Sequence, residues 1–332
     1  MSVVVVPAEV PRAWLASLDA AAAGGELEVF VGIEAVPEAR AGEVVGLFSL
    51  LTQRVDAALL DRFPGLRVVS NMAVGYDNVD VPACAARDIA VGHTPGVLTD
   101  ATADLAMALL LAAARRLDEA AGDARAGRWQ TWTPDGWLGV ELRGATLGIV
   151  GFGQIGQAVA ERARGFGVEL TYAGRPGSTR EAARAAELGA TRVELSELLA
   201  RSDFVSLHVP LTPETTRLID AAALAQIKPG AILINTARGG VVDQDAVLAA
   251  LRSGRLRAAA LDVTSPEPLP PEHPLYATPG CLVLPHIGSA TEATRKRMAA
   301  LACANLLAGV RRQALVHAVP GSQAAAEAPA KS

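Results

Sequence analysis

The sequence predicts an α/β protein in which a doubly wound parallel sheet forms one domain and a smaller α/β layer forms a second. Three observations support this fold class. Short apolar runs of strand length alternate with stretches of helical periodicity along most of the chain. A glycine-rich turn at Gly151–Gly156 directly follows one of these apolar runs. The length of 332 residues also suits two domains of ordinary size.

The composition argues against several classes of protein. The net charge of −5 comes from signs scattered along the chain, so there is no basic stripe for nucleic acid. The longest apolar run has about half the length that spans a bilayer, and the N-terminus lacks the basic region of a signal peptide. We therefore expect neither a membrane protein nor a secreted one. No spacing of Cys, His and carboxylate residues resembles a metal site.

The cysteines favour a reducing compartment. They are odd in number and lack C-x-x-C spacing, so we expect small buried thiols and a cytoplasmic protein; they are Cys84, Cys281 and Cys303.

The first half of the chain predicts a small parallel α/β layer. Apolar runs of strand length occur at residues 2–6, 27–31, 46–50, 66–70 and, more weakly, 89–92. Helical stretches lie between them, for instance at residues 11–23 and 55–63. Because this half lacks a glycine-rich phosphate turn, we expect it to form a separate, smaller domain.

A long helix is predicted from Asp100, a plausible N-cap, to about Gly122. It is apolar on most faces, so we expect it to be buried between layers or at an interface. A loop with three tryptophans follows, at Trp129, Trp132 and Trp137. These side chains could pack in the core or where two subunits meet, and the sequence leaves both alternatives open.

The glycine-rich turn predicts a Rossmann-type dinucleotide site. Gly151 permits a tight turn after the apolar strand at residues 147–150. Gly153 lets the backbone approach a pyrophosphate, and Gly156 lets the helix pack closely on the strand. The free N–H groups at the start of that helix point at the phosphates. A second strand at 168–173 completes the β-α-β unit.

Unusual polar residues follow almost every strand of the second half. The predicted strands are 147–150, 170–173, 204–207, 231–235, 258–262 and 282–285. In an open α/β sheet, ligands bind beyond the carboxyl ends of the strands. The residues at those ends are Gly151–Gly156, Gly174-Arg175, His208–Pro210, Thr236–Arg238, Asp262 and His286. The sequence therefore predicts one functional surface.

An amphipathic helix at about 292–310 ends the folded chain, before a tail rich in Ala and Pro that we expect to be disordered. Because six strands are already assigned to the second sheet, we expect this helix to return to the first domain. The prediction is a discontinuous substrate domain (1–98 plus 287–332) and a dinucleotide-binding domain (99–286), with a cleft between them.

Three side chains suit hydride transfer to a 2-keto acid. Arg238 offers a fixed, planar cation for the substrate carboxylate. His286 can donate a proton to the carbonyl oxygen of the substrate. The carboxylate of Glu267 can stabilise the imidazolium form of His286 and fix its ring. Each alone could be an ordinary loop residue. Together, beside a dinucleotide turn, they predict a catalytic set.

These motifs resemble the D-isomer-specific 2-hydroxyacid dehydrogenase family, and most closely its glyoxylate/hydroxypyruvate reductase branch. The resemblance extends from about residue 46 to 312. It is carried by the glycine turn and by the stretches SNMAVGYDNVD (70–80), VLTDATADLAMALLLAAARR (97–116), HVPLTPET (208–215), NTARGGVVDQDAV (235–247) and LDVTSPEPLP with LPHIGSAT.

The resemblance implies roles for residues. Arg238 would bind the substrate carboxylate, with Glu267 and His286 as the acid/base pair. The N–H groups of Val74 and Gly75 would hold the carboxylate beside Leu51. Family members are usually dimers, so we expect a homodimer. The expected cofactor-binding residues are Thr102, Phe152, Gly153, Gln154, Ile155, Gly156, Gly174, Arg175, Pro176, Pro210, Thr215, Thr236, Ala237, Asp262, His286 and Gly288.

The second strand of the β-α-β unit bears on the choice of cofactor. NAD-binding proteins carry an acidic residue there for the ribose 2′-hydroxyl, whereas this chain has Gly174-Arg175. With Arg180 close behind, we predict that NADP is preferred over NAD. The alternative is that Arg175 is merely solvated and that NADH is used by default.

Other functions remain open. A relative acting on a phosphorylated acid, such as a 3-phosphoglycerate dehydrogenase, would need cations near Val74 and Gly75, and residues 70–80 contain none. A dinucleotide-sensing, corepressor-like binding protein would share the fold. His208 follows a strand near the cofactor, and we expect a structural or cofactor-shell role for it rather than catalysis.

Overall fold

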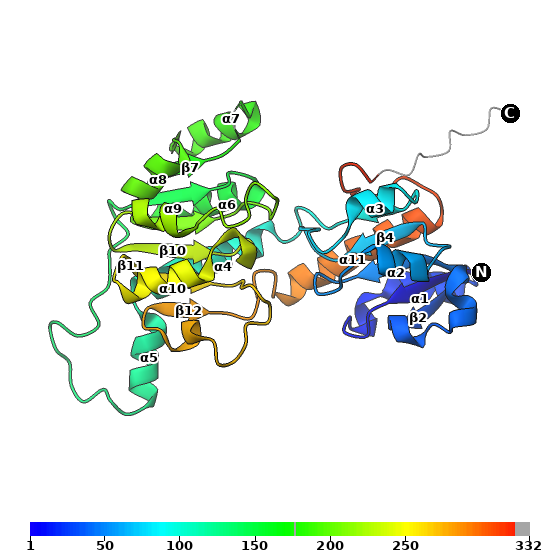
Figure 1. Cartoon of the computed structure of the whole chain (residues 1–332), viewed down its shortest axis with the longest axis horizontal. Coiled ribbons are helices and arrows are strands. Elements are labelled where there is room, and N and C mark those ends of the chain that lie inside the picture. The colour runs from blue at the N-terminus through cyan, green and yellow to red at the C-terminus, as the bar shows by residue number, and fades with distance from the viewer. Residues whose placement is uncertain (176, 323–332) are drawn as a thin grey trace. The chain divides into compact units, whose positions relative to one another are not determined.

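The computed structural model describes residues 1–175 and 177–322, and Pro176 lies outside the described residues. The chain splits into two compact units (Figure 1). The first unit comprises residues 1–98 with the described residues from Thr291 onward, and the second comprises Thr99–Ala290. No helix in the described part of the chain is long and apolar enough to cross a membrane.

The first unit is a five-stranded parallel sheet in the order β2-β1-β3-β4-β5. Its strands are β1 (Ser2–Val6), β2 (Leu27–Val31), β3 (Val44–Ser49), β4 (Val68–Asn71) and β5 (Ala90–Gly92). Its helices are α1 (Ala16–Ala23), α2 (Ala57–Arg62), α3 (Val81–Ala85) and α11 (Glu292–Val310), with short 3-10 turns at η1 (Arg12–Trp14), η2 (Ile33–Ala35) and η3 (Glu38–Glu43).

Helix α11 packs directly on the first sheet (Figure 1). Glycines make this approach possible: a Cβ at Gly46 of β3 would meet Leu306, and one at Gly309 of α11 would overlap Val68 of β4. Oγ of Ser70 also donates to the carbonyl of Ala302 at 2.7 Å. A segment from the end of the chain therefore completes the core of the first unit.

The second unit is a seven-stranded parallel sheet in the order β12-β11-β10-β9-β6-β7-β8. Its strands are β6 (Thr146–Val150), β7 (Glu169–Ala173), β8 (Ala190–Arg192), β9 (Phe204–Leu207), β10 (Ala231–Asn235), β11 (Leu256–Leu261) and β12 (Cys281–Val283). The strand order reverses between β6 and β9, where a doubly wound sheet binds its ligand.

Helices cover both faces of this sheet. The α-helices are α4 (Thr99–Ala114), α5 (Leu117–Arg125), α6 (Gln154–Ala163), α7 (Thr179–Leu188), α8 (Leu195–Arg201), α9 (Ala221–Gln226) and α10 (Gln244–Arg252). The 3-10 turns are η4 (Arg164–Phe166), η5 (Gly239–Val241) and η6 (Pro274–Ala277). One apolar core joins α4 and α6 to the sheet, and another joins α8, α9 and α10 to it.

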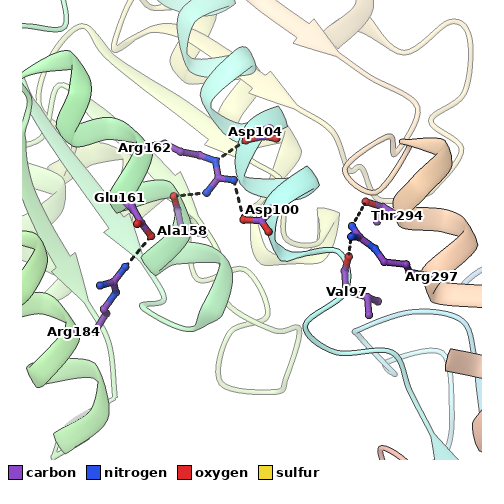
Figure 2. Close-up of polar contacts among 9 residues, drawn as sticks. All are labelled: Val97, Asp100, Asp104, Ala158, Glu161, Arg162, Arg184, Thr294 and Arg297. Carbon is purple, nitrogen blue, oxygen red and sulfur yellow. Dashed lines mark hydrogen bonds and ion pairs between the residues drawn. The ribbon is translucent and has the colours of Figure 1, made fainter.

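Ion pairs link the helices beside the glycine turn. Figure 2 shows Arg162 of α6 reaching Asp100 and Asp104 of α4, and Arg184 of α7 reaching Glu161 of α6. In the first unit, the same figure shows Arg297 of α11 donating to Thr294 and to the carbonyl of Val97. The first two sets of contacts fix α6 and α7 relative to each other and to α4.

Several expectations from the sequence need correction. The second sheet has seven strands rather than six, because β8 is a short edge strand whose Ala190–Arg192 side chains are half-exposed or exposed. The long helix ends at Ala114 rather than near Gly122, because Arg116 adopts a left-handed conformation (φ 54°). The stretch 11–23 is a 3-10 turn followed by the shorter α1.

The tryptophan loop does not pack in the core. Trp129 is 71% exposed and Trp132 is 79% exposed, so core packing is the wrong interpretation for both. The ring of Trp137 lies 4.7 Å under the guanidinium of Arg116. In contrast, α4 is largely buried within its own unit. The exposed apolar side chains therefore belong to the tryptophan loop and not to the apolar helix α4.

Candidate active site

The glycine turn begins where β6 ends. Gly151 has φ 92°, and a Cβ there would lie 2.8 Å from the backbone carbonyl carbon of His208. A Cβ at Gly156 would overlap the carbonyl oxygen of Gly151. A Cβ at Gly153 would meet no atom within 4 Å, so open space lies over this glycine. The turn is tightly packed at Gly151 and Gly156 and open at Gly153, and this open space suits a bound pyrophosphate.

Helix α6 starts at Gln154 with Gly153 as its N-cap, and no side chain caps its first N–H groups. Such groups, at the positive end of the helix dipole, form an anion site. Phe152 is buried and stacks on Tyr172 of β7, with ring centroids 4.1 Å apart. Gln157 donates to the carbonyl of Phe152 at 2.8 Å. The residues present therefore fit a dinucleotide.

At the end of β7, the expected cofactor residues Gly174 and Arg175 have different environments. Gly174 is half-buried and Arg175 is exposed. Pro176 lies outside the described residues. Helix α7 then begins behind a side-chain cap, in which Oγ of Ser178 accepts from the N–H of Glu181 at 3.3 Å.

At the end of β9, His208 is held as a neutral ring. Burial lowers the pKa of His208 to about 3, and its Nε2 lies 2.8 Å from Oγ of Ser206. The hydroxyl of Thr215 donates to the carbonyl of Pro210 at 2.6 Å and accepts from the N–H of Thr212 at 2.8 Å. This hydroxyl therefore holds its own loop together.

At the end of β10, an asparagine organises the turn that carries Arg238. Nδ2 of Asn235 donates to the carbonyl of Arg238 at 2.9 Å, and its Oδ1 accepts from the N–H of Ala237 at 3.0 Å. The hydroxyl of Thr236 is buried and has no hydrogen-bond partner among the described residues. Reasoning from the sequence missed Asn235, although it lies within the NTARGG stretch.

At the end of β11, Asp262 supports the loop that carries the candidate acid/base. Its carboxylate accepts from the N–H groups of Ile287 at 2.7 Å and Gly288 at 2.8 Å. Thr102 of α4 donates to the carbonyl of Gly288 at 3.2 Å. Burial raises the pKa of Asp262, and these two N–H groups oppose that rise. These bonds tie residues 287–290, which the sequence pattern assigns to the smaller domain, to the second unit.

The candidate acid/base pair is formed in this structure. Nδ1 of His286 donates to Oε1 of Glu267 at 2.5 Å. Burial alone would raise the pKa of Glu267, but the hydrogen bond and charge of His286 hold that pKa below its usual value. The charge of Arg238 acts in the same direction. The second unit therefore gathers Arg238, Glu267 and His286 in one region, as expected from the sequence.

A glutamine positions the loop that carries Glu267. Nε2 of Gln244 donates to the carbonyl of Ser265 at 2.6 Å, and its Oε1 accepts from the N–H of Ser265 at 2.8 Å. The N–H of Thr264 donates to Oε2 of Glu267 at 3.3 Å. Gln244 was not among the residues expected from the sequence, because its partners are backbone atoms twenty-one positions away.

In the first unit, two side chains hold the Val74–Gly75 turn. Asn71 donates to the carbonyl of Gly75 at 3.0 Å, and Nδ1 of His93 donates to the carbonyl of Val74 at 2.9 Å. Burial lowers the pKa of His93, and the hydrogen bond to the carbonyl of Val74 opposes that decrease. Leu51 is 37% exposed. Both Asn71 and His93 were missed from the sequence, where His93 offers no visible partner.

Comparisons with known proteins identify the family of the chain. Residues 107–288 match the family model described as the NAD-binding domain of D-isomer specific 2-hydroxyacid dehydrogenases. The chain is 50% identical over 270 residues to a glyoxylate reductase of Thermococcus litoralis, covering 80% of each chain. It is 48% identical over 272 residues to the mouse glyoxylate reductase/hydroxypyruvate reductase, covering 81% of this chain and 82% of that protein.

A solved structure has a similar fold over most of the chain. It is the NADPH-dependent glyoxylate/hydroxypyruvate reductase of Sinorhizobium meliloti in complex with NADP and malonate. The TM-score is 0.83 at 33% identity, covering 97% of each chain.

Proposed function

The chain belongs to the D-isomer-specific 2-hydroxyacid dehydrogenase family, and from this premise we propose that it reduces glyoxylate and hydroxypyruvate to the 2-hydroxy acids. It is an NAD(P)-dependent oxidoreductase. The observation that carries the proposal is the His286–Glu267 contact, with Arg238 close enough for its charge to lower the pKa of Glu267. A phosphorylated substrate and a corepressor-like sensor are not favoured, because the relatives above are named glyoxylate reductases.

When bound, the reduced nicotinamide supplies the hydride. Arg238 binds the substrate carboxylate with its planar guanidinium and so fixes the keto carbon. The imidazolium of His286 donates a proton from Nε2 to the carbonyl oxygen as it becomes a hydroxyl. Glu267, which stays ionised because its pKa is lowered, stabilises the imidazolium before the transfer and orients the neutral ring after it.

The first unit also carries residues to which the family resemblance gives a role in substrate binding. The carbonyls of Val74 and Gly75 are held by His93 and Asn71, and these bonds fix the direction of the turn. We assign to the N–H groups of Val74 and Gly75 the role of binding the substrate carboxylate. Leu51 supplies an apolar wall. Residues 70–80 contain no Lys or Arg, which favours a small substrate without phosphate.

For the cofactor, we assign the phosphates to the open turn at Gly153 and to the start of α6. The remaining contacts assigned to the cofactor come from Thr102, Phe152, Gln154, Ile155, Gly156, Gly174, Arg175, Pro176, Pro210, Thr215, Thr236, Ala237, Asp262, His286 and Gly288. Exposed Arg175 at the end of β7 supports a preference for NADP over NAD.

We also propose a homodimer in the cytoplasm. Trp129, Trp132 and Leu138 expose large apolar side chains on one loop, and such residues are frequent where subunits meet. The cysteines are free, and burial raises the pKa of each thiol, to about 11 for Cys84 and Cys303 and to about 12 for Cys281. Protonated, unpaired thiols suit a reducing compartment.

A panel of 2-keto acids tests the substrate. The initial rate of NADPH oxidation is measured with glyoxylate, hydroxypyruvate and 3-phosphohydroxypyruvate at equal concentrations. We expect kcat/KM for the first two to exceed that for the phosphorylated acid by about a hundredfold, since nothing in residues 70–80 neutralises a phosphate. A preference for the phosphorylated acid would contradict the proposal.

A further inference from the structure

The space next to Gly174, directly after β7, is occupied by a side chain from helix α7. In a β-α-β dinucleotide unit, the side chain after the second strand normally meets the ribose hydroxyls. Here that position is Gly174, directly after β7. A Cβ at Gly174 would overlap Oε2 of Glu181, which belongs to the first turn of α7. The carboxylate of Glu181 therefore lies where the side chain of residue 174 would begin.

A helix cap and two ion pairs hold helix α7, which carries Glu181, in place. Ser178 caps α7 by accepting from the N–H of Glu181, which fixes the first turn of the helix beside the end of β7. Arg184, one turn further along, is ion-paired to Glu161 of α6 (Figure 2) and to Glu187, at distances of 2.8 Å and 2.7 Å. Helix α7 is thus anchored to α6, and Arg184, one turn beyond Glu181, has other partners.

The carboxylate of Glu181 also has unused capacity to accept hydrogen bonds. Its Oε2 is shielded from solvent and has no hydrogen-bond partner among the described residues. A shielded carboxylate oxygen without a donor is unfavourable. Because the last torsion of a glutamate side chain is soft, a small rotation can direct this oxygen at a ligand hydroxyl.

We propose that Glu181 is the ribose-binding carboxylate of this protein, supplied from helix α7 in place of a side chain at residue 174. Its chemistry favours a 2′-hydroxyl, which donates to a carboxylate, over a 2′-phosphate, which a carboxylate repels. Exposed Arg175, adjacent to Gly174, has the opposite preference. The choice between NAD and NADP is a balance between these two side chains. This inference rests on the proposed function as an NAD(P)-dependent reductase.

Binding of nucleotide fragments to the full chain tests the proposal without turnover. Dissociation constants for ADP-ribose and for 2′-phospho-ADP-ribose are measured by titration calorimetry in the wild type and in Glu181→Gln. The substitution keeps the shape of the side chain but removes its charge. We expect the ratio of the two constants to shift toward the phosphorylated fragment by about tenfold, the value of one charged hydrogen bond.

Glu187→Gln is the matched control, since Glu187 is an exposed carboxylate on the same helix and pairs with Arg184. Its ratio should match that of the wild type. Gly174→Ala is a second, independent variant, because its Cβ displaces the carboxylate of Glu181. It should weaken ADP-ribose binding even if Glu181→Gln fails to fold.

An unchanged ratio in folded Glu181→Gln would overturn the proposal, as would a Gly174→Ala variant that binds ADP-ribose like the wild type. An equal shift in Glu187→Gln would assign the effect to the general charge of α7 and would also overturn it. The proposed function can fail while this proposal holds. In that case the ratio of the two dissociation constants would shift as expected in Glu181→Gln, but the wild type would reduce neither glyoxylate nor hydroxypyruvate. If neither fragment binds the wild type, both proposals fall.

Discussion

Nδ1 of His286 lies 2.5 Å from Oε1 of Glu267, and the two side chains reach this contact from loops that follow the adjacent parallel strands β12 and β11. The backbone around each partner is separately supported. Asp262 accepts hydrogen bonds from the two N–H groups directly after His286. Gln244 forms two hydrogen bonds with the backbone of Ser265, two residues before Glu267. The pair is therefore held in place before any substrate binds.

The pair predicts the pH dependence of reduction. Since His286 must carry a proton when the hydride arrives, kcat/KM for glyoxylate should fall as the imidazolium deprotonates. The hydrogen bond and charge of His286 lower the pKa of Glu267, and the negative charge of the Glu267 carboxylate favours the imidazolium in turn. Glu267→Gln should move the fall to lower pH. His286→Ala should lose roughly a hundredfold or more in kcat.

His208 provides the control for this pH profile. Burial lowers the pKa of His208 to about 3, so its ring does not titrate near neutrality. His208→Gln should change the rate without moving the fall in kcat/KM. A profile that shifts with His208→Gln, but not with Glu267→Gln, would show that the titrating group is not the His286–Glu267 pair.

Arg238 should affect the keto acid more than the cofactor. Lysine keeps the positive charge but loses the planar, two-pronged contact with a carboxylate. Arg238→Lys should therefore raise KM for glyoxylate by about tenfold or more, while the dissociation constant for NADPH changes little. Steady-state kinetics and cofactor titration separate the two effects. Equal weakening of both ligands would assign Arg238 to the cofactor.

Arg175 should determine the preference for NADPH. We expect kcat/KM with NADPH to exceed that with NADH by about tenfold, from charge-assisted contacts of about 1.5–3 kcal/mol each before screening. Added salt should weaken the preference, because Arg175 is exposed. Arg175→Asp should reverse it. Comparable kcat/KM values for the two cofactors at low ionic strength would leave Arg175 without this role.

The tryptophan loop should carry the subunit contact. Light scattering at micromolar concentration should give twice the mass of one chain, and replacing Trp129 and Trp132 together by serine should shift the mass toward that of a monomer. Both side chains are mostly exposed in the single chain, so the substitutions should leave thermal stability of the isolated chain nearly unchanged. A monomeric wild type would rule out the dimer.

The sequence predicted the sheets and the glycine turn well because their signals are local. Buried parallel strands read as apolar runs, and Gly151 and Gly156 are required by backbone atoms only a few Å away. Strand β8 was missed because its residues are not buried, and the break at Arg116 because arginine gives no turn signal.

The supporting residues could not be predicted in the same way. His93 and Gln244 donate hydrogen bonds to backbone carbonyls that lie nineteen or more positions away in the sequence. No residue pattern predicts such a bond. Glu181 resembles an ordinary helix-start glutamate in the sequence, three residues after its capping serine. Only the structure shows that the carboxylate of Glu181 lies where a side chain at residue 174 would begin.

The most direct test of the catalytic assignment is product formation in the wild type and in His286→Ala. Purified protein is mixed with NADPH and glyoxylate, and NADPH oxidised and glycolate formed are both quantified. We predict one glycolate per NADPH in the wild type and a rate lower by roughly a hundredfold or more in His286→Ala. NADPH binding without any glycolate from the wild type would contradict the account and indicate a dinucleotide sensor.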